Sequence, residues 1–297
     1  MDLPTSILGP ASVLLIFIGL VLVALYRQVR LQAGRRAAGQ LSDAQAFKMR
    51  GRMRRLERPT LLLIPTKSPG FSKVGGSPEL PHGTVWPEGD DGPLAFVAQI
   101  DIETFRQHGA FDWLPERGRL YLFFDDDRNG TADCGRLIYT TNPPGPECTA
   151  ASELAKNRRF LERRVGFRRF TSFPSPDWFD EDWPGHNMDW SGFKGLEDCD
   201  FGDEIEHRIG GYPGAIQDGQ MQIECEFLRQ GKTRDYRETV PDAIRVASRQ
   251  WRLLLQIDSD PALNMNWWDG GRLYVFIRAR DARRGDFSRI VTITQTH

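Results

Sequence analysis

Two segments of the chain repeat the same pattern, and this repeat is the strongest constraint on the fold. Residues 94–101 read LAFVAQID, and residues 251–258 read WRLLLQID. After a connection, each segment is followed by Gly-Arg-Leu-Tyr and further apolar residues, at residues 118–124 and 271–277. Apolar runs of this length that end in a polar group and a turn predict buried strands.

A Gly-Gly turn precedes each of these strand pairs. Residues 73–78 read KVGGSP, and residues 208–213 read RIGGYP. Three matching blocks in the same order predict an internal duplication of one β-rich unit, with halves of about residues 60–150 and 200–297. The period is far longer than that of a solenoid, so we expect two packed copies rather than an array.

Other segments carry shorter signals for strands and helices. The sequence predicts further strands at residues 60–64, 135–141, 163–172, 220–227 and 289–296, and helices that begin at residue 102 and span residues 149–160 and 241–250. Many short strands with few helices indicate an α+β fold that is β-rich, with mostly antiparallel sheets and an internal duplication.

The strand predicted at residues 220–227 depends on alternation alone. Met221, Ile223, Cys225 and Phe227 are apolar, and a polar residue separates each from the next. A period of two is typical of a strand with one buried face.

An apolar run of about 20 residues, Ile7–Tyr26, has the length that a helix needs to cross a bilayer. A cleaved signal peptide requires positive charge before such a run, but the chain begins Met-Asp-Leu-Pro-Thr-Ser. The sequence therefore predicts that residues 1–26 are an uncleaved N-terminal transmembrane helix that precedes the α+β domain.

A basic segment, residues 27–58, follows this predicted anchor. Residues 1–58 contain ten Lys and Arg against three Asp and Glu, and nine of the ten lie between Arg27 and Arg55. By the positive-inside rule, we expect a single-pass protein of the cytoplasmic (inner) membrane with its N-terminus outside and its globular domain in the cytoplasm. The segment is either a helix on anionic lipid or a solvated linker.

The globular domain, residues 59–297, is acidic, with 29 basic against 37 acidic residues. This charge argues against a nucleic-acid partner. The sequence contains no nucleophile elbow, His-Glu-x-x-His motif or dinucleotide fingerprint. We therefore predict no catalytic residue and no cofactor.

Four polar residues at the ends of the repeated strands are candidate ligand-binding residues. Gln99 and Asp101 end the first strand, and Gln256 and Asp258 end the second. Polar groups at strand ends can face a shared cleft and a ligand. The alternative is that each Gln bonds loop backbone and each Asp caps the next element.

Tryptophans beside carboxylates form a second candidate surface. Trp178 and Trp183 lie in a long acidic segment, and Trp267 and Asp269 lie just before residues 271–277. Exposed aromatic and acidic side chains suit a peptide or a cationic ligand. We expect these residues and the segment 125–130 to converge on one rim, unless the Trp side chains pack onto the sheet.

The segment 125–133 resembles the start of a calcium-binding loop. Asp125, Asp127 and Asn129 alternate before a glycine, and Asp133 stands at the ninth position. Oxygen ligands at alternate positions suit calcium, but Arg136 occupies the twelfth position, where a bidentate Glu is required. The alternative is a solvated hairpin tip.

Several of these motifs together resemble the YwqG-like family of bacterial proteins. The resemblance covers roughly residues 60–297 and rests on the Gly210-Gly211-x-Pro213 turn, the strand end Gln256–Asp258, and the segment Trp267–Gly271. Trp268 stands where the family pattern has a glycine. The resemblance implies a compact β-rich domain and supplies no established activity.

These observations favour a membrane-anchored cytoplasmic module that binds an unidentified protein or small molecule. The alternative is a hydrolase-like enzyme that uses carboxylates at the interface of the two repeats. A deep cavity with converging carboxylates of raised pKa would favour the enzyme, whereas a shallow aromatic groove would favour binding.

Overall fold

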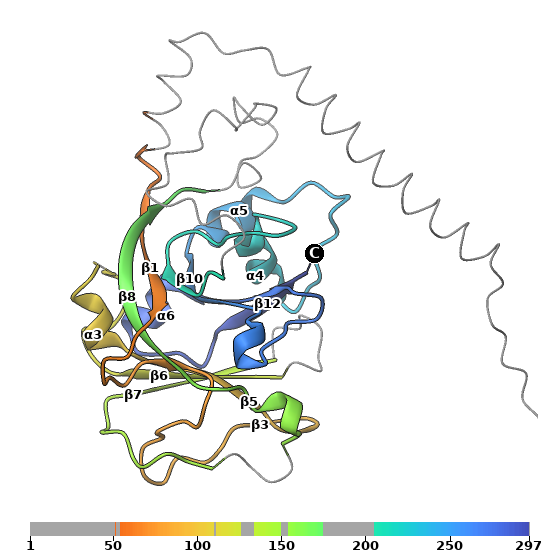
Figure 1. Ribbon diagram of the computed structural model, residues 1–297. Helices are drawn as coiled ribbons and strands as arrows, with labels where there is room; N and C mark the ends of the chain where they lie inside the picture. Colours follow the sequence, from red (N-terminus) through yellow and green to blue (C-terminus); the bar gives the residue numbers. More distant parts are fainter. Residues whose placement is uncertain are drawn as a thin grey trace, which may run out of the picture. The chain divides into compact units, whose positions relative to one another are not determined.

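The computed structural model describes residues 51, 54–109, 111–125, 134–149, 154–174 and 205–296, which form a ten-stranded sheet (Figure 1). Its strands are β1 (Arg58–Pro65), β2 (Lys73–Val74), β5 (Ala95–Asp101), β6 (Arg119–Phe124), β7 (Gly135–Thr140), β8 (Arg163–Ser172), β9 (Arg208–Gly210), β10 (Trp251–Asp258), β11 (Arg272–Arg278) and β12 (Val291–Gln295). Every neighbouring pair is antiparallel. The predicted β-rich, mostly antiparallel fold is confirmed.

Short elements complete the described part of the chain. They are the strands β3 (Glu88–Gly89) and β4 (Gly92–Pro93), the helices α3 (Ile102–Arg106), α4 (Met221–Arg229), α5 (Asp242–Ser248) and α6 (Ala279–Arg283), and the 3₁₀ turns η1 (Lys156–Arg158) and η4 (Pro261–Leu263). The few helices agree with the predicted α+β class.

The strand order is the same on both sides of a central pair. The sheet runs β12-β11-β10-β9-β1-β8-β2-β5-β6-β7, so β1 and β8 lie in the middle. Outward from this pair, β9, β10, β11 and β12 occupy the same places on one side as β2, β5, β6 and β7 on the other. We call these sides the C-terminal and the N-terminal half-sheet.

The strand register also agrees between the two half-sheets. Gln99 pairs with Tyr121, and Gln256 pairs with Tyr274. Each long ladder has one register shift, between Phe96 and Ala98 in β5 and between Leu253 and Leu255 in β10. The shift falls between the third and the first residue before the glutamine in both strands. Residues 95–101 thus correspond by register to residues 252–258.

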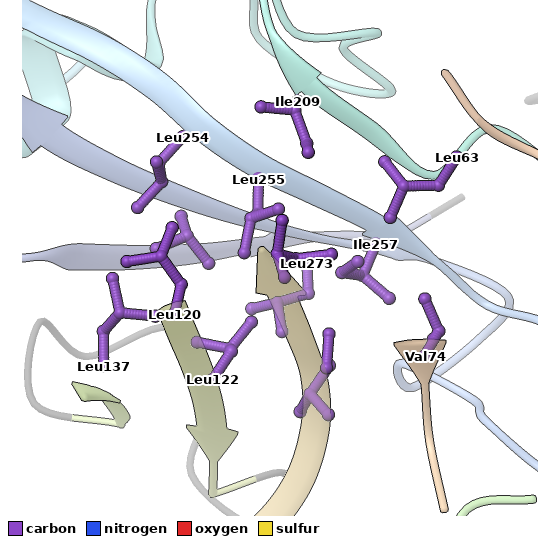
Figure 2. Packing of buried hydrophobic residues seen from close by; sticks show 14 of the residues in the cluster. Leu63, Val74, Leu120, Leu122, Leu137, Ile209, Leu254, Leu255, Ile257 and Leu273 are labelled. Atoms are coloured by element: carbon purple, nitrogen blue, oxygen red, sulfur yellow. The ribbon is translucent and has the colours of Figure 1, made fainter. Parts of the chain in front are cut away.

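One hydrophobic core joins the two half-sheets. Figure 2 shows Leu120, Leu122 and Leu137 of the N-terminal half-sheet around the same space as Leu254, Leu255 and Leu273 of the other. All six are buried. Burial of each such side chain contributes roughly 1.5–3 kcal/mol. The ten strands therefore form a near-barrel around this core.

The two edges of the sheet approach each other. A Cβ atom at Gly135 of β7 would lie 2.3 Å from Cγ2 of Thr292 in β12, so only glycine fits at this place. The rings of Tyr139 in β7 and Phe287 lie 4.8 Å apart between centroids. The edge strands meet through side chains, without a continuous ladder between them.

Helix α4 corrects the strand predicted at residues 220–227. Met221 and Cys225 are one helical turn apart and pack on Trp251 and Phe276 of the C-terminal half-sheet. Ile223 instead packs with the residues around helix α5. The apolar residues at every second position therefore pack against two different neighbours on two faces of the helix. Their spacing is the same as that of a strand with one buried face.

The helix predicted at residues 149–160 is wrong over its described part. Residues 154–160 contain only the 3₁₀ turn η1. Phe160 packs on Trp267, and the N–H of Leu161 donates to the carbonyl oxygen of Leu263 at 2.8 Å. These tertiary contacts hold an extended chain where helix propensity alone favours a helix.

The predicted membrane anchor, Ile7–Tyr26, lies outside the described residues, as do residues 27–50. Within the described ranges, no helix has the length and apolar character needed to span a membrane.

Candidate functional site

Gln99 is fully buried and bonds to the backbone both before and after β2. Its Oε1 accepts from the backbone N–H of Glu79 at 2.9 Å, and its Nε2 donates to the carbonyl oxygen of Phe71 at 2.8 Å. The hydroxyl of Tyr121, its cross-strand partner, donates to the carbonyl oxygen of Glu79 at 2.8 Å.

Gln256 makes the corresponding bonds in the C-terminal half-sheet. Its Oε1 accepts from the N–H of Gly214 at 2.8 Å, and its Nε2 donates to the carbonyl oxygen of Glu206 at 3.1 Å. The hydroxyl of Tyr274 donates to the carbonyl oxygen of Gly214 at 2.7 Å. Both glutamines thus act on loop backbone, as the structural alternative predicts, and their ligand-binding role stays a prediction.

The two aspartates at the strand ends have different surroundings. Asp101 caps α3 by accepting from the N–H of Glu103 at 3.0 Å, as the sequence predicts. Asp258 is buried, and its Oδ1 lies 3.1 Å from Nε of Arg272. Burial raises the pKa of Asp258, and the charge of Arg272 only partly offsets this effect.

A buried lysine, Lys73, gathers three carboxylates beneath the N-terminal half-sheet. Its Nζ lies 2.8 Å from Glu162, 3.0 Å from Glu147 and 3.8 Å from Glu79. The lysine is fully buried, and these carboxylates offset the cost of removing its ammonium group from water. The cluster ties three separate segments of the chain together.

His207 and Asp260 form a buried pair on the other side of the central strands. Nδ1 of His207 accepts from the N–H of Asp258 at 3.1 Å, and Nε2 lies 3.6 Å from Asp260. Burial alone would raise the pKa of Asp260, but the nearby imidazole of His207 and the charge of Arg163 hold that pKa below its usual range. Asp260 is therefore charged at neutral pH.

The structure corrects the expectation that Trp267 is exposed on a rim. Trp267 is only 1% exposed, and its ring lies 5.6 Å from those of Phe124 and Phe160. Trp268 is 47% exposed instead, with a φ of 59°. That left-handed backbone suits the glycine of the family pattern. Asp269 is exposed beside it.

The remaining sequence candidates are mostly outside the described residues. Trp178 and Trp183 lie there, and so do Asp127, Asn129 and Asp133 of the possible calcium loop. Asp125 is described, buried, and 3.1 Å from Nη2 of Arg158. No group of His, Cys, Asp and Glu suited to a metal occurs within the described ranges. The rim and the calcium site stay predictions.

A groove of about 450 Å³ runs along the edge strand β7, beside the segment before β12. We call it the seam groove. Its lining residues come from three separate segments: Pro87, Glu88, Gly135, Arg136, Leu137, Ile138, Phe287, Ser288 and Ile290. Most of this wall is apolar, and its charged residues have opposite signs.

A smaller cavity of about 160 Å³ lies where β9 ends between β1 and β10. We call it the arginine pocket. Its lining residues are Arg58, Pro59, Phe111, Asp112, Trp113, Gly211, Arg252 and Leu253.

Sequence reasoning missed both cavities and the Lys73 cluster. Their residues come from segments far apart in the chain and follow no motif spacing. Gly211 lines the arginine pocket, but the sequence identifies it only as part of a repeated turn. The assembly of these sites is a property of the strand order, which a single sequence does not display.

The chain matches one family model, described as Domain of unknown function (DUF1963), over residues 72–295. The matched range begins just before β2 and ends with β12. No curated protein matches the chain.

Proposed function

This chain belongs to the DUF1963 family, an uncharacterised domain family, and from that premise we propose a function based on its geometry. The domain is a binding module that holds a short extended peptide in the seam groove. It acts without catalysis, and residues 1–26 tether it to the membrane.

The observation that carries this proposal is the position of the seam groove along an edge strand. β7 lies at one end of the sheet order, and four consecutive residues of β7, Gly135 to Ile138, line the groove. An edge strand offers unpaired backbone groups to an added strand. Four residues of an extended peptide span about 13 Å along such an edge.

The side chains of the groove indicate the kind of peptide. Leu137, Phe287 and Ile290 provide apolar surface, and Glu88 and Arg136 carry opposite charges. A segment with apolar residues and little net charge fits this lining.

The distribution of carboxylates supports binding over hydrolysis. Burial raises the pKa of Asp258 and of Glu224, as a general acid would require. Neither residue lines the seam groove or the arginine pocket. Glu88 is the one carboxylate among the described residues that line the groove, so these residues offer no carboxylate pair.

We propose further that the chain is a YwqG-like protein and that its two half-sheets arose by duplication. The mirrored strand order and the matching bonds of Gln99 and Gln256 support the duplication. All four glycines of the two Gly-Gly turns have positive φ, between 68° and 79°. Trp268 shares that backbone conformation at the position of the family's glycine.

A randomised linear peptide library tests the binding function on the full-length protein in lipid nanodiscs. Ser288→Trp fills the seam groove, and Val246→Trp places the same side chain on an exposed position of α5. We expect peptides that bind the wild type and V246W but bind S288W at least tenfold more weakly. Bound peptide should also slow amide exchange in residues 135–140.

The peptide proposal fails if no peptide is selected, or if selected peptides bind S288W as tightly as the wild type. Loss of binding in S288W counts only if its melting temperature stays close to that of V246W. The membrane tether is tested separately. A reporter fused after His297 should be active only if it is one that works in the cytoplasm. Activity of a reporter that works only in the periplasm would overturn the proposed topology.

A further inference from the structure

The arginine pocket exists because β9 is shorter than its neighbours. β9 pairs Gly210 with Thr60 of β1 and Ile209 with Leu255 of β10. Beyond Gly210 the chain turns away, while β1 and β10 continue to Arg58 and Trp251. Strands two places apart in a sheet are separated by about 9.5 Å. The missing strand segment leaves the 160 Å³ space between them.

Aromatic side chains close part of this space. Phe111 and Trp113 line it, and a Cβ atom at Gly210 would lie 2.3 Å from Phe111. The remaining volume of about 160 Å³ compares with roughly 30 Å³ for one water molecule in the liquid. The pocket therefore has room for one small polyatomic group and a few waters, but not for a nucleotide.

The charged groups around the pocket are mostly positive. Arg58 and Arg252 line it, and the charge of Arg283 also acts on Arg252. Asp112 is the one carboxylate among the described residues that line the pocket, and it lies 3.5 Å from Arg283. Burial lowers the pKa of Arg252, and repulsion from Arg58 lowers it further, while Asp112 and Tyr212 act in the opposite direction.

Both lining arginines are held in place by the fold. Nη1 of Arg252 donates to the carbonyl oxygens of Arg249 at 2.7 Å and Trp251 at 2.9 Å. Its Nε and Nη2 have no acceptor among the described residues. The guanidinium of Arg58 lies 4.2 Å from the centroid of the Tyr212 ring. These contacts reduce the entropy that either side chain would lose when it binds an anion.

The corresponding place in the N-terminal half-sheet carries no such pair. By strand register, Arg252 corresponds to Ala95, and Arg58 corresponds to Phe160. Phe160 packs on Trp267 in the core. The scaffold therefore does not require two arginines at this place, and their presence calls for a reason specific to the C-terminal half-sheet.

We propose that the arginine pocket binds one phosphate group between Arg58 and Arg252. The planar guanidinium fork matches phosphate oxygens, and a bound anion relieves the repulsion between the two cations. The phosphate comes either from a lipid headgroup or from a soluble phosphate. Arg58 is the last residue of the basic segment that follows the proposed anchor.

The test uses full-length protein in neutral phosphatidylcholine nanodiscs, with inorganic phosphate added at constant ionic strength. Phosphate should raise the melting temperature of the wild type, because a ligand that binds only the folded state stabilises it. In Arg252→Gln the apparent Kd should rise about tenfold or more, since a charge-assisted bond is lost. Arg237→Gln removes an exposed arginine outside the pocket and should respond like the wild type.

A second arm replaces part of the neutral lipid by phosphatidic acid and adds no phosphate. A higher melting temperature that depends on Arg252 indicates a lipid headgroup, and a shift with inorganic phosphate alone indicates a soluble phosphate. The proposal is overturned if neither probe shifts the wild type, or if R252Q responds as strongly as R237Q. Should R252Q not fold, Arg58→Gln replaces it, with the same expected loss and the same overturning result.

Discussion

The two half-sheets differ most at the cation that each places beside the central strands. Lys73 of β2 pairs with Gln99, and Arg208 of β9 pairs with Gln256, so the two cations correspond by register. Lys73 lies among three glutamates. Arg208 instead forms an ion pair with Glu206 and lies 5.3 Å from the ring of Phe170.

This difference separates what the scaffold requires from what each half adds. The glutamine, tyrosine and glycine positions are the same in both halves because they hold the loop backbone that follows β2 or β9. The carboxylates that contact Lys73 or Arg208 can differ between the halves, since they come from side chains outside the repeated blocks. Residues that differ between the two halves at corresponding positions are therefore the better candidates for function.

The largest expected effect is the loss of the buried lysine. Lys73→Met leaves three carboxylates around one apolar side chain. These side chains are 24–54% exposed, so we expect a loss of about 3 kcal/mol, the lower end of the range for breaking a buried ion pair. Arg208→Met removes the cation beside Glu206, and we expect a smaller loss because Lys73 lies within 4 Å of three carboxylates. Urea unfolding of both variants checks the order, and an equal loss would show that the extra carboxylates carry no energetic weight.

The next effect concerns Glu226, a buried carboxylate in α4 with no counterpart in the N-terminal half-sheet. Burial opposes its charge, but hydrogen bonds from Arg229, Trp251 and Gln230 lower its pKa to about 2. Because the folded pKa is depressed, its contribution is present above about pH 4.5 and is lost as the pH falls toward 2.

Glu226→Gln should therefore lose about 3 kcal/mol of unfolding free energy at pH 7 and lose less as the pH falls. Asp258→Asn should change the pH dependence of stability in the opposite direction. Burial raises the folded pKa of Asp258, so the wild type loses stability as the pH rises above the ordinary carboxyl range, and D258N lacks this loss. The free energy of unfolding of each variant, measured at several pH values and compared with that of the wild type, gives the slope of this difference against pH. Slopes of equal sign for E226Q and D258N would contradict the opposite pKa shifts of Glu226 and Asp258.

A smaller effect tests the correspondence directly. Gln99→Leu and Gln256→Leu each leave a partly buried backbone N–H without its acceptor, at Glu79 and Gly214. Such a loss costs about 1–3 kcal/mol. The two variants should lose similar amounts, and because the two sites are far apart, the double variant should lose their sum within roughly 0.5 kcal/mol. A clear inequality in thermal or urea unfolding would show that the two loops differ in importance.

The smallest expected effect concerns the turn before β11. Trp268 has a φ of 59°, which costs about 1 kcal/mol for a residue other than glycine. Trp268→Gly should raise stability by roughly 0.5 kcal/mol, since the greater entropy of unfolded glycine offsets part of the gain. Asn264→Gly, at a φ of 54°, should gain less because asparagine tolerates this conformation. Loss of stability in W268G would indicate that the exposed ring makes a contact of its own.

The repeated blocks predicted the ladders well because their constraints are local. The Gln-Ile-Asp strand ends, the cap at Asp101 and the Gly-Gly turns each follow from one residue's bonding or backbone freedom. The strand predicted at residues 220–227 failed because its alternating apolar residues face two different neighbours. Periodicity cannot distinguish that case from a strand.

The candidate sites were harder to predict, for a physical reason. Trp267 stands in a polar segment, yet its ring fills the core between Phe124 and Phe160. Arg58 and Arg252 are almost 200 residues apart and meet only because β1 lies beside β9. Such contacts depend on strand order, which local propensity does not encode.

The central position of β1 also has a mechanical consequence. β1 lies between β8 and β9, and it pairs with β8 over eight positions, from Arg58 to Pro65. A pull on the chain before Arg58 runs along this strand and shears its ladders, so many hydrogen bonds share the load at once. In a protein tethered through that end, tension would meet the longest ladder of the sheet first. The domain should therefore resist unfolding by a force applied at its N-terminal side. During folding, β1 can pair only after strands more than 100 residues later in the chain are available.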